Sequence, residues 1–237
     1  SFAYQDKEVL HDINITLPKN SLTALVGPSG SGKSTVMKLC ARFYDPQKGC
    51  IFFNGVPMNE INPESLMSHI SMVFQDVYLF QDTIRNNIRF GKTDATEEEI
   101  IAAAKKACCH DFIMRLPKGY DTLVGEGGCT LSGGEKQRIS IARAMLKDAQ
   151  IILLDEATAS LDPENEVEVQ KAIDALIKGH TVIAIAHRLK TIKGADQIIV
   201  LDNGQIKEKG THETLMQAEG LYAQLWNIQE QISGWKL

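Results

Sequence analysis

The chain has 237 residues, of which 43% are hydrophobic and 23% are charged, and its formal net charge is −5. These proportions are ordinary for a globular protein, and the 7 prolines and 18 glycines exclude collagen-like and low-complexity classes. A membrane-spanning helix needs roughly 20 apolar residues, whereas the longest apolar runs, such as Val182–Ala186, are much shorter. The acidic balance argues against a nucleic-acid partner bound by bulk electrostatics. We therefore expect a soluble domain that does not itself span a bilayer.

The first residue and the cysteines indicate the setting of this domain. The sequence opens on Ser1 rather than Met, inside a strand pattern over Ser1–Tyr4, which indicates a segment cut from a longer chain. The cysteines show no C-x-x-C spacing, so reduced thiols are expected rather than structural zinc. These are Cys40, Cys50, Cys108, Cys109 and Cys129.

Strand patterns alternate with helical patterns along much of the chain, which predicts an α/β fold with a mostly parallel sheet covered by helices. Short apolar runs predict buried strands at Leu22–Val26, Ile70–Phe74, Ile151–Leu154 and Thr181–Ala186. Two Asn-Gly pairs, at Asn54-Gly55 and Asn203-Gly204, predict hairpins. A small antiparallel β-subdomain is therefore expected beside the parallel core.

The middle of the chain, about residues 76–147, has helical periodicity and few strand signals. Helices are predicted over Thr96–Ala107 and Glu135–Leu146, so this stretch is interpreted as a helical subdomain inserted into the core. The β-subdomain and core would then occupy about 1–75 and 148–237 of a single domain, 1–237. Near the end, Leu221–Ile232 has the pattern of an amphipathic helix.

The strongest chemical signal is a G-x-x-x-x-G-K-[ST] motif between the strand Leu22–Val26 and a helix predicted over Ser34–Arg42. Its glycines let backbone N–H groups surround phosphate oxygens, and the helix N-terminus adds partial positive charge. Lys33 supplies a point charge to the outer phosphates, and the Ser34 hydroxyl is a ligand for Mg²⁺. The motif, here called the phosphate loop, consists of Gly27, Pro28, Ser29, Gly30, Ser31, Gly32, Lys33, Ser34 and Thr35.

A second signal is the buried strand Ile151–Leu154, which runs directly into Asp155 and Glu156. Two carboxylates at the end of a buried strand are costly unless they serve a cation or a reaction. Asp155 is predicted to join the Mg²⁺ shell, and Glu156 to act as the general base that takes a proton from the attacking water.

A third signal is the segment Leu131–Arg138. Ser132 with Glu135 forms an S-x-x-E capping box, while Gly133-Gly134 leave bare amides at a helix N-terminus, which is also a phosphate site. The chain thus carries two helix starts suited to phosphate. Sequence spacing leaves open whether they meet in one chain or across two.

These motifs together resemble the nucleotide-binding domain of ATP-binding cassette (ABC) transporters over the whole chain. Leu131–Gln137, here called the signature segment, resembles the family's signature motif, with Glu135 where many members have Gln. The resemblance implies a P-loop NTPase (ABC ATPase) fold with a RecA-like core, and ATP and Mg²⁺ as ligands. It also implies a head-to-tail pair of domains, in which Ser132 and Gly134 contact the γ-phosphate of the partner's ATP.

Further roles follow only from the resemblance. Tyr4 resembles the aromatic residue that stacks on adenine, and Gln75 the glutamine that reaches Mg²⁺ and the attacking water. His187 resembles the switch histidine at the γ-phosphate. Asp162 resembles the loop that communicates between two sites, although Asp162-Pro163 is also a good helix N-cap.

Two segments resemble the exporter type, close to subfamily B multidrug and lipid exporters. They are Leu79–Ile88 and Phe112–Gly128, which in exporters contact the coupling helices of the membrane domain. Glu126 matches the usual glutamate, whereas Gly127-Gly128 departs from the more typical Arg-Gly. Thr96–Ala107 is interpreted as an exposed helix.

We therefore expect an ATPase that powers export at the cytoplasmic face of the cell membrane. Its expected partners are a transmembrane domain, fused N-terminally in the parent protein, and a second nucleotide-binding domain in a homo- or heterodimer. No nucleic-acid partner is expected. The alternatives are a non-transport ABC ATPase of DNA repair or translation, and a regulatory domain that binds ATP without turnover.

Overall fold

The computed structural model describes residues 1–5, 7–155, 163–186 and 188–234. They form two compact units. The first unit combines Ser1–Ile70 with Thr181–Leu237, and the second comprises Ser71–His180. Glu156, Asp162 and His187, three of the predicted site residues, lie outside the described residues.

In the first unit, strand β3 (Leu22–Val26) lies between two parallel neighbours, β8 (Thr181–Ile185) and β9 (Gln197–Asp202). Strand β9 also pairs antiparallel with β10 (Gln205–Gly210). Apolar residues without alternation occupy β3 and β9 because both faces of these strands are buried.

The remaining elements of the first unit are short. Strand β1 (Phe2–Tyr4) pairs with β2 (Lys7–Leu10), and β4 (Phe52–Phe53) pairs with β5 (Val56–Pro57), both antiparallel. The helices are α1 (Lys33–Cys40), the 3₁₀ helix η1 (Met58–Glu60), α2 (Pro63–Ser68), η4 (Leu189–Ile192), α8 (His212–Gln217) and α9 (Leu221–Gly234).

Helices α8 and α9 are attached to the sheet of the first unit through one apolar cluster. Ala24 and Val26 of β3 pack there with Tyr222 of α9, which is fully buried. The Tyr222 hydroxyl lies 2.9 Å from Nδ1 of His212, so its polar end has a partner inside the cluster. The end of the chain is thereby anchored to the strand that precedes the phosphate loop.

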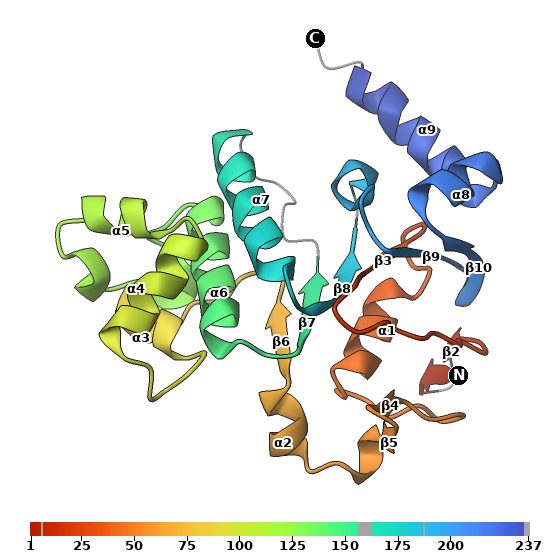
Figure 1. The fold of residues 1–237 in the computed structure, drawn as a ribbon, viewed down its shortest axis with the longest axis horizontal. Helices are drawn as coiled ribbons and strands as arrows, with labels where there is room; N and C mark the ends of the chain where they lie inside the picture. The colour runs from red at the N-terminus through yellow and green to blue at the C-terminus, as the bar shows by residue number, and fades with distance from the viewer. Residues whose placement is uncertain (6, 156–162, 187, 235–237) are drawn as a thin grey trace. The chain divides into compact units, whose positions relative to one another are not determined.

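The second unit is mainly helical. Strands β6 (Ile70–Val73) and β7 (Ile151–Asp155) are hydrogen-bonded neighbours. Helix α6 (Gly133–Lys147) packs against α3 (Ile84–Arg89), α4 (Glu97–Lys106) and α7 (Pro163–Ile177) (Figure 1). Helix α5 (His110–Arg115) and the 3₁₀ helices η2 (Gly119–Asp121) and η3 (Glu126–Gly128) complete it.

The expected fold class is confirmed: parallel strands form the core sheet, and separate antiparallel pairs accompany it. Both Asn-Gly hairpins form where they were predicted. Helix α1 ends at Cys40, earlier than predicted, since Arg42 has a φ of 54° and leaves the helical region. The predicted helical stretch 76–147 falls inside the second unit, which also contains β7 and α7. The subdomain boundaries stay a prediction.

Two expectations from composition concern the chain as a whole. Among the helices of the described residues, none is long and apolar enough to cross a membrane. All five cysteines lie in the described part of the chain and are free thiols, as expected.

Candidate functional site

The phosphate loop connects β3 to α1 in the first unit, and backbone geometry explains its glycines. Gly27 has a φ of 146°, and a side chain there would collide with the carbonyl oxygen of Leu201. Gly30 also has positive φ and borders open space. Gly32, at φ 103°, is the N-cap of α1, and no side chain of the described residues caps that helix. The first-turn N–H groups of α1 are therefore suited to an anionic ligand.

Lys33 is held inside this loop. Its side chain is buried, and Nζ donates to the carbonyl oxygens of Gly27 at 2.9 Å and Pro28 at 2.8 Å. Ser31 Oγ lies 3.4 Å from the same nitrogen. The loop thus fixes one positive charge beside the start of α1. Ser34, the next residue, is exposed on the first turn of α1, while Thr35 is buried.

Tyr4 lies on β1 in an aromatic cluster. Its ring packs edge-on against Phe2, with centroids 4.8 Å apart, and against Tyr44, with centroids 5.3 Å apart. Tyr44 is 44% exposed and was not singled out from the sequence, because its neighbours come from distant segments. The cluster places Tyr4 on a fixed aromatic support.

The second unit contains the other described site residues. Asp155 is the last residue of β7 and is half-buried, as expected for a carboxylate at a strand end. Gln75 is exposed, two residues beyond the end of β6. Within this unit, the Gln137 side chain of α6 donates to the carbonyl oxygen of Phe74 at 3.4 Å. Helix α6 is therefore hydrogen-bonded to the residue that precedes Gln75.

The signature segment begins α6 with the predicted capping box. Ser132 Oγ accepts from the Glu135 N–H at 3.3 Å, and the Glu135 carboxylate accepts from the Ser132 N–H at 2.8 Å. Ser132 and Gly133 are exposed, whereas Gly134 is buried. A Cβ at Gly134 would lie 2.5 Å from Cβ of Asn165 on α7, so the close approach of these helices requires glycine.

Sequence reasoning missed a polar connection between α3 and α6. Asn87 is buried, accepts from the Phe80 N–H at 2.9 Å and donates to the Phe80 carbonyl at 3.0 Å. Arg143 donates through Nε to the Asn87 carbonyl at 2.9 Å. Burial lowers the pKa of Arg143 from its ordinary value. The Asn86-Asn87 pair carries no sequence signal for this role.

Arg143 also supports an aromatic surface. Its guanidinium lies 5.7 Å from the ring centroid of Phe80 and 5.5 Å from that of Phe90. Tyr78 packs edge-on against Phe80, with centroids 5.7 Å apart. The three rings, here called the aromatic face, are 42–60% exposed. Exposed apolar clusters of this kind mark interaction sites.

Comparison with known proteins identifies the family. The profile of the family described as ABC transporter matches residues 10–159. The chain therefore belongs to the ABC transporter family. Within that family it is similar to a member of subfamily B and to a solved ABC exporter.

Three relatives illustrate the similarity. The ATP-dependent lipid A-core flippase of Legionella pneumophila (strain Paris) is 51% identical over 226 residues, covering 95% of this chain and 38% of that protein. ATP-binding cassette sub-family B member 6 of Rattus norvegicus is 49% identical over 231 residues, covering 97% and 28%. A solved bacterial Atm1-family ABC exporter with ATP bound has a TM-score of 0.91 and 47% identity, covering 96% and 40%. The chain thus spans less than half the length of these relatives.

Proposed function

We propose that this chain binds Mg·ATP and hydrolyses it to drive export across a membrane, as one domain of a larger transporter. The observation that carries the proposal is the phosphate loop: positive-φ glycines, a buried lysine held by loop carbonyls, and a helix N-terminus without a side-chain cap. Such a site matches the charge and shape of a nucleotide's phosphates. Tyr4, on its aromatic support, is proposed to stack on the adenine.

Each residue that we propose as a ligand for Mg²⁺ has the chemistry that this ion prefers. Ser34, Gln75 and Asp155 offer hydroxyl, amide and carboxylate oxygens, the ligand type that Mg²⁺ prefers. Bound Mg²⁺ would supply positive charge to the phosphate oxygens during transfer. Asp155 is proposed to bind through a carboxylate oxygen, and Ser34 through its exposed hydroxyl.

Hydrolysis is proposed to use residues that follow the two buried strands β7 and β8. Glu156 takes a proton from a water molecule as the water oxygen attacks the γ-phosphorus and the bond to the ADP oxygen breaks. Lys33 and His187 donate to the γ-phosphate oxygens, where negative charge gathers. Gln75 positions the attacking water.

A second copy or a related chain is proposed to complete the site. The Ser132 oxygen already accepts from the Glu135 N–H, so the hydroxyl proton is available to donate to a phosphate oxygen. The Gly133 and Gly134 amides lie in the first turn of α6, where backbone N–H groups lack helical acceptors. We propose that these groups contact the γ-phosphate on the partner, and that Asp162 links the two sites.

The membrane partner is proposed to dock on the second unit. The aromatic face lies on and beside the segment Leu79–Ile88, which resembles the exporter region that contacts coupling helices. Burying its rings against a membrane domain would remove apolar area from water. We propose on this basis that the chain lies at the cytoplasmic face of a membrane.

Replacement of Glu156 by glutamine tests the proposal. We expect Glu156→Gln to keep ATP binding, to slow phosphate release at least about a hundredfold because the base is lost, and to lengthen the life of an ATP-bound dimer. Binding is measured by isothermal titration, turnover by phosphate release and dimerisation by light scattering. A variant that hydrolyses ATP at the wild-type rate would refute the role of Glu156.

A further inference from the structure

Two segments that flank different site motifs are joined by a short antiparallel pairing in the second unit. The Ile84 N–H donates to the Thr122 carbonyl at 3.0 Å, and the Val124 N–H donates to the Asp82 carbonyl at 2.9 Å. Between them, Thr83 and Leu123 form a β-bridge. Residues 82–84 follow Gln75 in the chain, and residues 122–124 precede Ser132. The pairing therefore connects the segment after Gln75, which is proposed to reach Mg²⁺ and the attacking water, to the segment before Ser132, a proposed phosphate contact.

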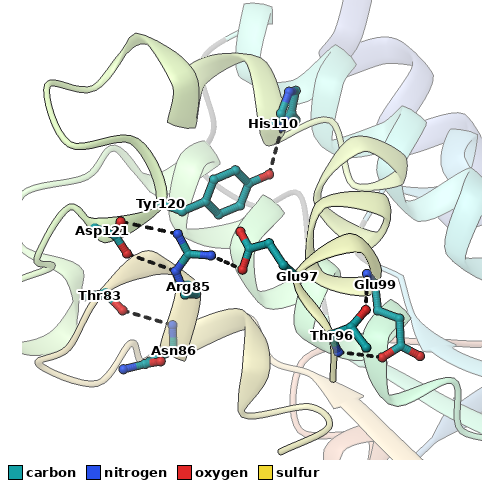
Figure 2. A network of polar contacts seen from close by, with 9 residues as sticks. All are labelled: Thr83, Arg85, Asn86, Thr96, Glu97, Glu99, His110, Tyr120 and Asp121. Atoms are coloured by element: carbon teal, nitrogen blue, oxygen red, sulfur yellow. Dashed lines mark hydrogen bonds and ion pairs between the residues drawn. The ribbon is translucent and has the colours of Figure 1, made fainter. Parts of the chain in front are cut away.

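A side-chain cluster closes one end of this pairing. Arg85 directly follows Ile84, and Asp121 directly precedes Thr122. Arg85 donates through Nε to Asp121 Oδ1 at 2.9 Å and through Nη2 to Oδ2 at 3.3 Å (Figure 2). This two-bond geometry fixes the direction between the two segments as well as their distance.

The same guanidinium reaches two further elements. It forms an ion pair with Glu97, the first residue of α4, and lies 5.7 Å from the ring centroid of Tyr120 (Figure 2). The buried Tyr120 ring is fixed in turn, because its hydroxyl lies 2.9 Å from Nδ1 of His110 on α5. Arg85, Glu97, His110, Tyr120 and Asp121, here called the Arg85 cluster, thus connect α3, α4, α5 and η2.

The charges in this cluster stabilise one another. The hydrogen bonds that Arg85 donates to Asp121 and Glu97 raise the pKa of Arg85, and the bond to Asp121 lowers the pKa of that carboxyl below its usual range. Arg85 and Asp121 are therefore both charged at neutral pH. The contribution of the cluster to stability is limited by solvent, since the Asp121 side chain is 67% exposed. The many contacts of Arg85 are therefore better explained by a role in holding its neighbours in position than by a large contribution to the free energy of unfolding.

We propose that Arg85 is a positioning residue that makes the segment after Gln75 and the segment before Ser132 move as one body. The inference rests on the proposed ATPase function and adds a residue that contacts neither nucleotide nor metal. The two segments are joined at their main chains by the 82–84 and 122–124 pairing, and Arg85 fixes the end of that pairing. Movement at Gln75 is thereby transmitted to Ser132, and movement at Ser132 to Gln75.

Arg85→Ala compared with a matched control tests this inference. Lys92→Ala removes another ion pair of the same unit, Lys92–Glu99, whose side chains are 41% and 42% exposed and which is not part of the 82–84 and 122–124 pairing. We expect Arg85→Ala to keep the Kd for Mg·ATP within about twofold and to lower kcat about tenfold, because misplaced contacts slow the reaction. Lys92→Ala is expected to keep both values.

Whether kcat or only Tm changes in Arg85→Ala distinguishes a positioning role from a purely structural one. A purely structural role would lower Tm in Arg85→Ala and leave kcat at 25 °C unchanged, and that result overturns the inference. Where Arg85→Ala fails to fold, Arg85→Lys replaces it: lysine keeps the charge but lacks the planar fork, so a reduced kcat supports positioning and a wild-type kcat overturns it.

Asp121→Ala completes a double-mutant cycle. If Arg85 and Asp121 act only through their contact with each other, the double variant has the same kcat as Arg85→Ala alone. If the two single-variant losses of kcat multiply in the double variant, the residues act independently and the inference is contradicted. A wild-type chain that releases no phosphate would instead refute the proposed function. If the wild-type chain releases phosphate and Arg85→Ala releases it at the same rate, only the role of Arg85 is refuted.

Discussion

Lys33 shows how a single side chain can be prepared for its ligand before the ligand arrives. Its ammonium is buried, and such a charge is costly without partners. Hydrogen bonds to the carbonyl oxygens of Gly27 and Pro28 offset the loss of hydration of the ammonium group. The loop therefore stores a positive charge in a fixed position, so little side-chain entropy is lost when phosphate binds.

Removing this charge is expected to weaken nucleotide binding. Charge-assisted hydrogen bonds contribute about 1.5–3 kcal/mol, so Lys33→Ala should raise the Kd for ATP roughly 10–100-fold. Lys38→Ala is the matched control, because Lys38 is exposed in the last turn of the same helix, α1. Isothermal titration measures both. Equal affinities in the two variants would contradict the assigned role of Lys33.

Gly134 illustrates a residue whose role is the absence of a side chain. Gly134→Ala would place a methyl group 2.5 Å from Asn165 Cβ, and we expect it to lower the free energy of unfolding by about 1–3 kcal/mol. Gly194→Ala, which borders open space without positive φ, should change it by less than about 1 kcal/mol. Urea denaturation distinguishes the two. A neutral Gly134→Ala variant would show that α6 and α7 tolerate separation.

The site residues differ in how far the sequence reveals them. Lys33, Asp155 and Ser132 sit in local motifs, and the structure places them at the start of α1, the end of β7 and the N-cap of α6. Arg85 and Asn87 act through partners far away in sequence, such as Asp121 and Arg143. Only the folded chain brings those partners together, so no local pattern could predict them.

At the scale of elements, one helix start is stabilised by a neighbouring strand. Helix α9 begins at Leu221, and the Glu208 carboxylate of β10 accepts from the N–H groups of Leu221 and Tyr222. A carboxylate at a helix N-terminus satisfies orphan donors and favours the helix dipole. The strand thus supplies the cap of the last helix.

Loss of this cap is expected to destabilise the first unit. Glu208→Ala should lower the free energy of unfolding by about 0.5–2 kcal/mol, the usual range for a lost N-cap. Lys209→Ala, at an exposed position of the same strand, should have little effect. Thermal denaturation monitored by circular dichroism measures both. A Tm for Glu208→Ala equal to that for Lys209→Ala would refute the cap.

Elements with local signals were predictable, and those made by distant pairing were not. Both Asn-Gly hairpins formed because the turn residues themselves adopt the required positive φ. The bridge between Thr83 and Leu123 joins segments separated by α3, α4, α5 and the 3₁₀ helix η2, and its residues show no strand alternation. Local propensity therefore predicts the strands but not this connection.

For the molecule as a whole, thiol reactivity reports the folded state. Cys109 is buried, and desolvation raises its pKa to about 12, so its reactive thiolate is scarce at pH 8. Cys50 and Cys129 are exposed. Iodoacetamide followed by peptide mass spectrometry should modify Cys50 and Cys129 first, and Cys109 only after unfolding. Rapid modification of Cys109 in the native chain would contradict its burial.

The central claim is that two copies or related chains build an ATP-hydrolysing site from the phosphate loop of one and the signature segment of the other. The most direct measurement is phosphate release from Mg·ATP per chain, as the concentration of the purified chain is increased. We expect the rate per chain to rise with concentration, and the same series to stay near background for Glu156→Gln. Binding of Mg·ATP without phosphate release by the wild-type chain at any concentration would contradict the account.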